Sequence, residues 1–299
     1  MKILVTGATG LIGKSLVKKL EEKGHFVNIL TRKKSGKFNE FQWDPQKNYI
    51  EDDAFEGVEA IIHLAGATIA KRWTENYKKE LYSSRINAAN LIKSYCEKHH
   101  IKLDSFISAS GINYYGTFTT NEFLTEKTPI KKLDFLAQLS KDWEDAAYQF
   151  SDISKRMVCL RTSMVLAKNG GSFVPLKKLT DFNLASPVGK GEQWMNWIHI
   201  DDLVNMYVEA LENENLNGSY NAVADEIVSN KDFMKILAEK SNKFFLPIAV
   251  PEFIMKLVLG EMSSIILEGT RASNHKIKFA GFSFKFPNLN EALDHLLEK

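Results

Sequence analysis

Three glycines near the start of the chain constrain its fold more than any other feature of the sequence. Gly7, Gly10 and Gly13 recur at every third position, directly after a short apolar run at Lys2–Thr6 and at the start of a segment with apolar residues at helical spacing. Glycine at such a junction permits a tight turn and a close approach of the helix to the strand. The pattern predicts a strand, a turn and a helix at the beginning of a sheet.

The same alternation of short β-type runs and helical segments continues up to Leu166. It is typical of βαβ units, which build a parallel sheet with helices on both faces. We therefore expect an α/β protein with a Rossmann-type, doubly wound parallel sheet. The strands are predicted at Lys2–Thr6, Phe26–Thr31, Ala60–Leu64, Ser105–Ala109 and Arg156–Thr162, and the helices at Gly13–Lys23, Trp73–His99 and Leu139–Phe150.

A second, smaller α/β domain is expected in the remainder of the chain. A length of 299 residues exceeds what one hydrophobic core usually serves. We place the Rossmann domain at 1–166, with the chain returning to it at about 197–225, and the small domain at 167–196 and 226–299. The elements expected here are a strand–helix unit at Trp197–Glu212, a strand at Gly218–Ala222 and helices at Lys231–Lys240, Glu252–Leu259 and Leu289–Leu297.

Composition and charge exclude several classes of protein. With 44% hydrophobic and 25% charged residues, the chain is not of the disordered class. Its net charge of +2, from 39 basic and 37 acidic residues, provides no electrostatic footprint for nucleic acid or an anionic membrane. Cys96 and Cys159 lack metal-ligand spacing, so no metal site is expected. The apolar run Ile3–Val5 is too short for a signal peptide or a membrane span, and we expect a cytoplasmic protein.

The glycine turn also indicates a chemistry. The N-terminus of a helix offers oriented N–H groups to an anion, and a turn without side chains lets the backbone approach a pyrophosphate. Three glycines in an ordinary loop are the alternative, but their position on the first strand favours a dinucleotide site. The cofactor-binding residues expected here are Gly7, Thr9, Gly10, Leu11, Ile12 and Gly13.

The end of the second predicted strand favours NADP(H) over NAD(H). An NAD site places a carboxylate at this point to bind the ribose hydroxyl, whereas a 2′-phosphate requires a cation. Here the chain has Thr31 and Arg32, followed by Lys33 and Lys34, which could assist. The alternative is a solvated basic turn.

Longer motifs make the chain similar to a known family. It resembles the atypical extended short-chain dehydrogenases/reductases of the NAD-dependent epimerase family over essentially its whole length, including their short C-terminal domain. The motifs that carry this resemblance are GATGLIG, HLAGA, RWTENYKKELYSSRINAANLI, ISASGINYYG, DWEDAA, LRTSMVLAKNGGSF, PVGKGEQWMNWIHIDDLV and GFSFKFPNLNEAL.

The resemblance implies further cofactor contacts. Thr31 and Arg32 would meet the adenosine phosphate, and the small residues after the strand in HLAGA would let the cofactor pass close to the backbone. Arg85 would pair with the pyrophosphate, unless it forms a surface ion pair with Glu80. The remaining cofactor residues implied are Leu64, Ala65, Gly66, Glu80 and Met164, the last near the nicotinamide.

The catalytic residues depart from the family pattern. Short-chain dehydrogenases use a Tyr-x-x-x-Lys pair as acid and base; here Lys141 occupies the lysine position, but Ala137 replaces the tyrosine. Ser110 matches the hydroxyl that orients the substrate, and Tyr114 or Tyr115 is a candidate surrogate acid. The alternatives are a structural tyrosine and a solvated lysine. The catalytic candidates are Ser110, Tyr114 and Lys141.

On the substrate side, Gln193 and Trp194 are candidate pocket walls, and Asp201 and Asp202 match the positive end of a helix dipole. His199 is interpreted as a packing residue.

The function expected is an NADP(H)-dependent oxidoreductase or epimerase-like enzyme acting on a small hydroxyl or carbonyl compound. The alternative is a catalytically inactive NADP(H)-binding sensor or scaffold. A sugar-nucleotide epimerase proper fits less well, because such enzymes normally use tightly held NAD and the missing tyrosine. A homodimer through the helix at Trp73–His99 is a further hypothesis, unless the apolar stripe of that helix packs entirely on the sheet.

Overall fold

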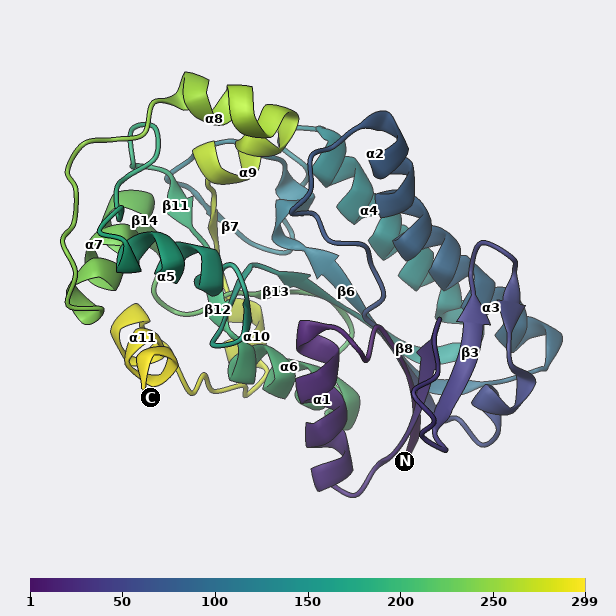
Figure 1. Cartoon of the computed structure of the whole chain (residues 1–299). Coiled ribbons are helices and arrows are strands. Elements are labelled where there is room, and N and C mark those ends of the chain that lie inside the picture. Colours follow the sequence, from purple (N-terminus) through teal and green to yellow (C-terminus); the bar gives the residue numbers. More distant parts are fainter. Residues whose placement is uncertain (299) are drawn as a thin grey trace.

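An eight-stranded sheet forms the centre of the molecule (Figure 1). The computed structural model describes residues 1–298. All neighbouring strands of this sheet are parallel except for the pair at one edge, which is antiparallel. In spatial order the strands are β13 (Gly218–Ala222), β8 (Ser154–Thr162), β6 (Leu103–Gly111), β5 (Ala60–His63), β1 (Lys2–Thr6), β2 (Phe26–Thr31), β3 (Glu40–Asp44) and β4 (Tyr49–Ile50).

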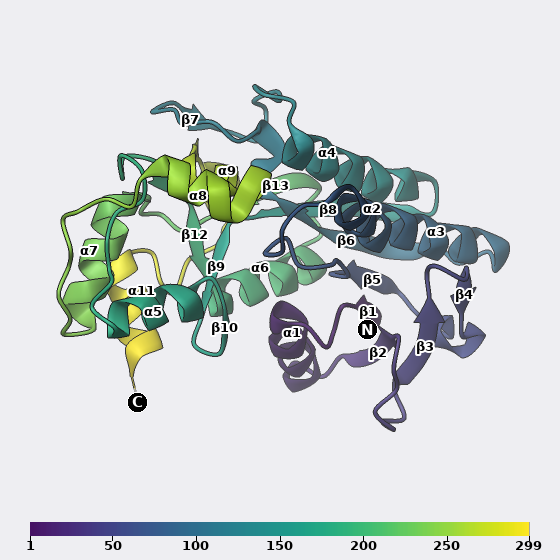
Figure 2. The ribbon, with the colours of Figure 1, turned by 45° about the horizontal axis from the view of Figure 1, so that its top comes forward.

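Helices cover both faces of this sheet, as side-chain alternation along its strands requires. Within the core of the sheet, Ile3 and Val5 of β1 pack in one layer with α1 and α6, whereas Leu4 packs in another layer with α3. Figure 2 shows α1 and α6 on one side and α2, α3 and α4 on the other. The predicted fold class, a Rossmann-type α/β protein, is confirmed. The helices are α1 (Leu11–Glu22), α2 (Glu75–Tyr82), α3 (Ala88–Lys98), α4 (Phe135–Tyr148), α5 (Phe173–Asp181), α6 (Ile200–Glu212), α7 (Asn230–Lys240), α8 (Glu252–Leu259), α9 (Ser264–Leu267), α10 (His275–Phe279) and α11 (Leu289–Leu297).

Within residues 1–298, no helix has both the length and the apolar character that crossing a lipid bilayer requires.

One long helix predicted at Trp73–His99 is wrong. Thr74 caps α2, its hydroxyl accepting the N–H of Tyr77 at 3.2 Å, and a five-residue π-helical segment at Ser83–Asn87 then separates α2 from α3. A π turn changes the phase of a helix relative to its neighbours. In this segment Arg85 is buried rather than on the helix surface.

The β3–β4 edge of the sheet was not predicted from the sequence. In β3 the apolar residues Phe41 and Trp43 alternate with polar ones and pack in one core, but two apolar residues in a five-residue segment are a weak signal for a strand. Hydrogen bonds from Ser35 satisfy the Glu40 carboxylate and hold its pKa below the usual range.

A second hydrophobic core lies beside the sheet. Leu166, Phe173, Trp197, Phe233 and Leu293 meet there, from segments far apart in the sequence. Its helices are α5, α7 and α11 (Figure 1). Three sets of short strands pair outside the large sheet: β9 (Met164–Ala167) with both β10 (Gly170–Gly171) and β12 (Trp197–His199), β11 (Trp194–Met195) with β14 (Val228–Ser229), and β7 (Phe123–Leu124) with β15 (Arg271–Ala272).

A buried carboxylate ties the two cores together. Asp202, in the first turn of α6, accepts the backbone N–H groups of Lys285 at 2.7 Å and Phe286 at 2.9 Å. Burial raises the pKa of this carboxyl group. The neighbouring Asp201 is exposed and pairs with the Lys285 side chain at 3.2 Å. Both aspartates lie at the positive end of the helix dipole, but only Asp202 also accepts buried N–H groups from a distant segment.

We expect Asp202→Ala to lower the free energy of unfolding by about 2–4 kcal/mol, because two buried N–H groups would lose their acceptor. Asp201→Ala is the matched control and should cost less than about 1 kcal/mol, since its ion pair is exposed. Urea unfolding followed by circular dichroism measures both. Equal losses in the two variants would contradict the assignment.

Candidate functional site

The glycine turn lies directly against the end of β5. Gly7 has a positive φ of 70°. A Cβ atom at Gly7 would lie 2.7 Å from the backbone carbonyl carbon of Leu64, and one at Gly13 would lie 2.2 Å from the carbonyl oxygen of Gly7. Neither position has room for a side chain. The structure thus brings together the two predicted cofactor segments, the glycine turn and the residues after β5.

The N-terminus of α1 is open. The helix starts at Leu11 after Gly10, which has no side chain to cap it. No side chain among residues 1–298 accepts a hydrogen bond from the N–H groups of Leu11, Ile12 or Gly13, and these groups have no acceptor inside the helix. Thr9 lies exposed beside them. The arrangement suits an anion held by backbone donors.

The basic turn after β2 leaves one arginine unpaired. Thr31 is buried, and its hydroxyl donates to the carbonyl oxygen of Lys33 at 2.9 Å, which fixes the turn. Lys34 pairs with Glu51 at 2.9 Å. Arg32 is exposed and forms no ion pair with any other described residue. Its guanidinium is therefore available at the carboxyl end of β2.

A buried histidine, which the sequence analysis missed, organises the end of β5. The Nε2 of His63 donates to the carbonyl oxygen of Arg85 at 3.1 Å, so its Nδ1 accepts from the Thr6 hydroxyl at 2.9 Å. The same hydroxyl accepts the N–H of Ala65 at 3.1 Å. Burial, with a smaller contribution from the charge of Arg85, lowers the pKa of His63 to about 4. A polar residue inside the apolar run IIHLA was the signal for it.

Arg85 stabilises the loop after β5 from within. Its Nη2 donates to the carbonyl oxygen of Ala67 at 2.8 Å and its Nη1 to that of Leu81 at 3.1 Å. A Cβ atom at Gly66 would lie only 2.9 Å from the guanidinium carbon of Arg85, so this position has no room for a side chain. Burial lowers the pKa of Arg85 to about 10. The alternative of a surface ion pair with Glu80 is wrong for the described residues; contact with a pyrophosphate stays a prediction.

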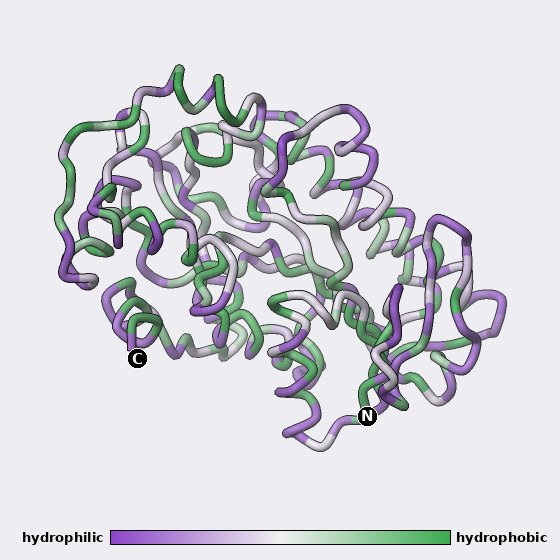
Figure 3. The backbone as a smooth tube through the Cα atoms, viewed as in Figure 1, coloured by the Kyte–Doolittle hydropathy of each residue, from purple (hydrophilic) through white to green (hydrophobic). Residues whose placement is uncertain are grey.

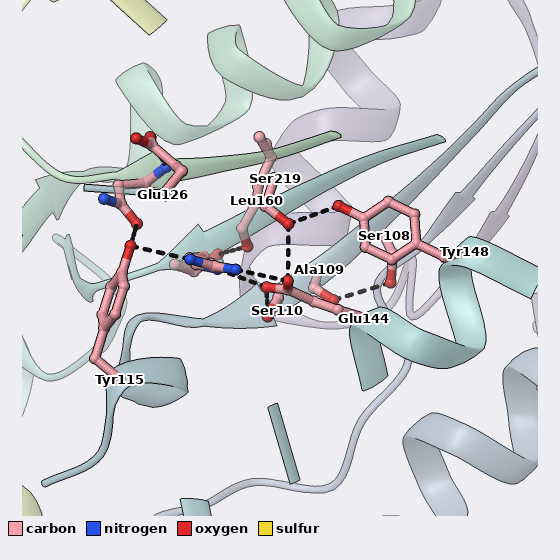
Figure 4. Close-up of polar contacts among 12 residues, drawn as sticks. Ser108, Ala109, Ser110, Tyr115, Glu126, Glu144, Tyr148, Leu160 and Ser219 are labelled. Carbon is pink, nitrogen blue, oxygen red and sulfur yellow. Dashed lines mark hydrogen bonds and ion pairs between the residues drawn. The ribbon is translucent and has the colours of Figure 1, made fainter. Parts of the chain in front are cut away.

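Ser110 belongs to a buried polar network (Figure 4). Its hydroxyl donates to Glu144 at 2.8 Å, and Arg161 binds the same carboxylate with two N–H groups at 2.7 and 2.9 Å. The Ser219 hydroxyl donates to it at 2.7 Å and in turn accepts from Tyr148 at 2.8 Å. Burial alone would lower the pKa of Arg161, but Glu144 outweighs it and the pKa is raised. The proton of Ser110 is thus directed at a carboxylate rather than at a substrate.

The two candidate tyrosines have different environments. Tyr115 is fully buried; its hydroxyl accepts from Arg161 at 3.0 Å and donates to Asn221 at 2.8 Å. Burial raises its pKa to about 12. These contacts favour the structural alternative for Tyr115, and a catalytic role for it stays a prediction. Tyr114 is partly exposed, with the Arg161 guanidinium 3.5 Å from its ring centroid.

Lys141 points away from this network. It pairs with Asp145 on the exposed side of α4, and that hydrogen bond raises its pKa. Next to Lys141, Ser140 lies against the end of β6, where its Oγ is 3.0 Å from the position of a Cβ on Gly111. Ala137 is completely buried. Ser140, not Lys141, thus occupies the sheet-facing position, and the sequence alone does not specify this phase of the helix.

The remaining site candidates lie at the junction of the two cores. Met164 begins β9, and its N–H donates to the carbonyl oxygen of Asn196 at 3.1 Å. Gln193 is buried and donates to the backbone of Ile266 at 2.8 Å. Trp194 is partly exposed and donates to Asn121 at 3.0 Å. Gln193 therefore has a structural contact, and Trp194 offers the more accessible surface.

A cavity of about 730 Å³, not anticipated from the sequence, opens between the β3–β4 turn and α3. Its lining has no charged side chain and mixes amide and hydroxyl groups with Pro45 and Leu91. The Oδ1 atom of Asn90, one of the lining residues, is buried without a hydrogen-bond partner among the described residues. The cavity lies beside the carboxyl end of β3, next to the β2 end that carries Arg32. The lining residues are Pro45, Gln46, Asn48, Ser83, Asn87, Asn90, Leu91 and Ser94.

His199, Asp201 and His295 lie close enough to suggest a metal site. However, Nδ1 of His199 accepts the N–H of Asp201 at 3.1 Å, so Nε2 carries the proton and faces Nδ1 of His295 at 3.1 Å. To bind a metal through Nε2, His199 would have to carry its proton on Nδ1 instead. There the proton would face the N–H of Asp201, which is also a donor. The cluster is better explained as a helix cap joined to α11.

Two family models match this chain. The model of the NAD dependent epimerase/dehydratase family matches residues 3–223, and that of a domain of unknown function, DUF1731, matches residues 250–296. An epimerase family protein of Staphylococcus haemolyticus is 32% identical over 99% of both chains.

Two solved structures are similar over 99% of this chain. The human epimerase family protein SDR39U1, crystallised with NADPH, has a TM-score of 0.89 and 28% identity, and 99% of it is covered. A nucleoside-diphosphate sugar epimerase of Corynebacterium glutamicum has a TM-score of 0.81 and 29% identity, with 58% of that chain covered.

The buried imidazole of His63 predicts a pH dependence. The unfolded chain takes up a proton near pH 6.5, whereas the folded chain resists it until about pH 4. This contribution to stability is complete above pH 6.5 and is lost as the pH falls toward 4, by about 3 kcal/mol. Urea unfolding between pH 7.5 and 4 should show a shallower acid loss for His63→Asn than for the wild type. The control, exposed His100→Asn, should follow the wild type; parallel curves for all three would contradict the prediction.

Proposed function

Because this chain belongs to the NAD dependent epimerase/dehydratase family, we propose that it is an NADP(H)-dependent oxidoreductase acting on a small hydroxyl or carbonyl compound. The observation that carries the proposal is Arg32, an exposed and unpaired guanidinium at the end of β2, beside the open N-terminus of α1. A guanidinium fits the ribose phosphate that distinguishes NADP(H) from NAD(H). The NADPH in the human relative supports the same cofactor here.

The residues present fit a dinucleotide along this edge of the sheet. The N–H groups of α1 would hold the pyrophosphate, and the absence of side chains at Gly7 and Gly10 would admit it. At the adenosine end, Asn90 lines the cavity, and its amide would offer hydrogen-bonding groups to adenine. Met164 lies toward the nicotinamide end.

The acid in this proposal is Tyr114. NADPH, when bound, supplies a hydride to the carbonyl carbon of the substrate, and the carbonyl oxygen then needs a proton. Ser110 donates to Glu144, Tyr115 is buried and Lys141 is paired with Asp145. Tyr114 is the partly exposed phenol at the end of β6, and Arg161 fixes its ring.

A second candidate function is NADP(H) binding without turnover, in a sensor or scaffold. The contacts of Ser110 and Lys141 favour it, because both hydrogen-bond within the protein. The two functions share the cofactor site and differ in hydride transfer.

The cofactor proposal predicts that NADPH binds at least tenfold more tightly than NADH, a difference of about 1.4 kcal/mol. Arg32→Ala should abolish this difference and leave NADH binding unchanged, because only the 2′-phosphate contact is lost. Fluorescence titration measures both dissociation constants. Lys18→Ala removes an exposed cation elsewhere in the domain and should keep the preference. A preference that survives Arg32→Ala would reject the role of this residue.

The chemical proposal predicts that Tyr114→Phe lowers the rate of carbonyl reduction by about 10²–10⁴-fold with an unchanged dissociation constant for NADPH. Single-turnover oxidation of NADPH, followed at 340 nm with a panel of small aldehydes and ketones, measures it. Tyr49→Phe, at the exposed sheet edge, is the control. Tight NADPH binding without any oxidation across the panel would instead support the binding protein.

A further inference from the structure

The hydroxyl group of Ser140 lies at the end of β6 without a hydrogen-bond partner. The residue is only 6% exposed, and no group within residues 1–298 forms a hydrogen bond with its Oγ. Apolar packing surrounds it: Leu136 and Leu139 of the same helix are buried in a hydrophobic core, and Figure 3 shows hydrophobic chain in the central strands. A hydroxyl this buried normally has a partner, and one without a partner costs free energy of folding. The stability of the fold therefore does not explain this polar group.

The position of this hydroxyl is at the reactive end of the proposed cofactor site. Gly111, against which Ser140 lies, ends β6 and pairs with Thr162, two residues before Met164. Neighbouring strands are about 4.8 Å apart, so the end of β6 is roughly 14 Å from that of β2, across β1 and β5. A dinucleotide with its adenosine end at Arg32 and its pyrophosphate at α1 continues across β5 toward β6. A substrate beside the nicotinamide would therefore meet the sheet at this point.

The absence of a side chain at Gly111 keeps the hydroxyl of Ser140 uncovered. The backbone of Gly111 is extended, with φ of −113° and ψ of 141°, a conformation that any residue adopts. The chain therefore does not need glycine here for its turn. A Cβ atom at this position would lie 3.0 Å from the Oγ of Ser140, closer than an ordinary van der Waals contact. Glycine thus serves the neighbouring hydroxyl rather than the backbone.

Most other polar groups near this strand end are already engaged. Ser110 donates its proton to Glu144 at 2.8 Å. Lys141 is held in an ion pair on the other side of α4. The phenol of Tyr114, in the short turn that follows β6, is partly exposed. The alcohol of Ser140 and this phenol are therefore the two hydroxyl groups that a substrate oxygen could meet.

We propose that the Ser140 hydroxyl donates a hydrogen bond to the carbonyl oxygen of the substrate, the orienting role expected of Ser110 from the sequence. This inference rests on the proposed carbonyl reduction. There the carbonyl carbon receives a hydride from NADPH, which is oxidised, and the oxygen receives the proton of Tyr114, while Ser140 keeps its own proton. The hydrogen bond strengthens as negative charge develops on the oxygen. Ser140 has no partner in the protein to give up for it.

The first experiment measures stability, which requires no substrate. Ser140→Ala removes a hydroxyl without a partner, so its midpoint of urea unfolding should equal or exceed that of the wild type. Ser110→Ala takes a donor away from the buried Glu144 carboxylate and should lower the midpoint. Circular dichroism follows both transitions. If Ser140→Ala loses as much stability as Ser110→Ala, the hydroxyl is structural and the proposal is wrong.

The second experiment locates the hydroxyl. Cys96 and Cys159 are buried, so Ser140→Cys introduces the thiol that a small reagent, methyl methanethiosulfonate, should reach first. NADPH at about ten times its dissociation constant should slow the modification about tenfold, because the nicotinamide half would cover this position. Gln138→Cys, at an exposed position of the same helix, should react equally with and without nucleotide. A thiol at position 140 that bound NADPH does not protect, or that does not react at all, would contradict the placement.

The third experiment measures turnover. Ser140→Ala should lower kcat/KM for carbonyl reduction by about 10–100-fold, the usual effect of losing a hydrogen bond to a charged oxygen, with an unchanged dissociation constant for NADPH. Gly111→Ala, which crowds the same hydroxyl, should also lower kcat/KM. Ser241→Ala is the matched control, because it removes another buried hydroxyl without a partner, at the end of α7. It should leave kcat/KM unchanged.

Two turnover results would overturn the role of Ser140 alone. One is an unchanged kcat/KM in Ser140→Ala. The other is a loss of NADPH affinity in this variant that accounts for its whole loss of activity, because the hydroxyl would then bind the cofactor and not the substrate. A wild type that binds NADPH but oxidises none across the panel of carbonyl compounds is a different result. It would refute the proposed function, and the substrate contact of Ser140 with it.

Discussion

The buried ion pair between Glu144 and Arg161 is the interaction on which the candidate site depends. Both side chains are almost inaccessible to water, and such a pair is tolerated only when its remaining donors and acceptors are satisfied. Ser110 and Ser219 satisfy the carboxylate, while Tyr115 satisfies the guanidinium. The pair therefore connects α4 and β8 to the ends of β6 and β13. It also fixes the ring of Tyr114, so the accessible phenol has one defined position. Loss of either charge would leave the other buried and unpaired, which typically costs about 3–5 kcal/mol.

The rest of the site is built from close backbone approaches rather than from charges. Gly7 and Gly13 bring the β1–α1 turn against Leu64, and the neutral imidazole of His63 fixes the distance between Thr6 and the backbone of Arg85. These contacts leave the N–H groups of α1 free and direct them along one edge of the sheet. The second core meets this edge through Asp202 and Asn196, so its position relative to the cofactor side depends on a few buried hydrogen bonds.

Several residues of the site could be predicted from the sequence because the signal for each of them lies within a few neighbouring residues. The glycine spacing, the basic turn at Arg32 and the small residues after β5 follow from steric and charge requirements within a few residues. Lys141 was identified by its spacing in a motif, yet the phase of α4 turns it toward Asp145 and places Ser140 against β6. Arg85 was expected near the cofactor on a continuous helix, but a π turn buries it under the loop. In both cases the outcome depends on packing against segments distant in sequence.

By itself the sequence determined the α/β alternation, the glycine turn and the cation at the end of β2, because hydrophobic period, the steric freedom of glycine and charge are properties of neighbouring residues. Only the tertiary structure decided which of two adjacent tyrosines is accessible, which face of α4 meets the sheet and where Asn90 leaves an acceptor unpaired. It also decided that the Ser140 hydroxyl lies at the end of β6 without a partner. Those outcomes depend on how elements far apart in the chain pack together, and a side chain is buried or exposed only relative to them.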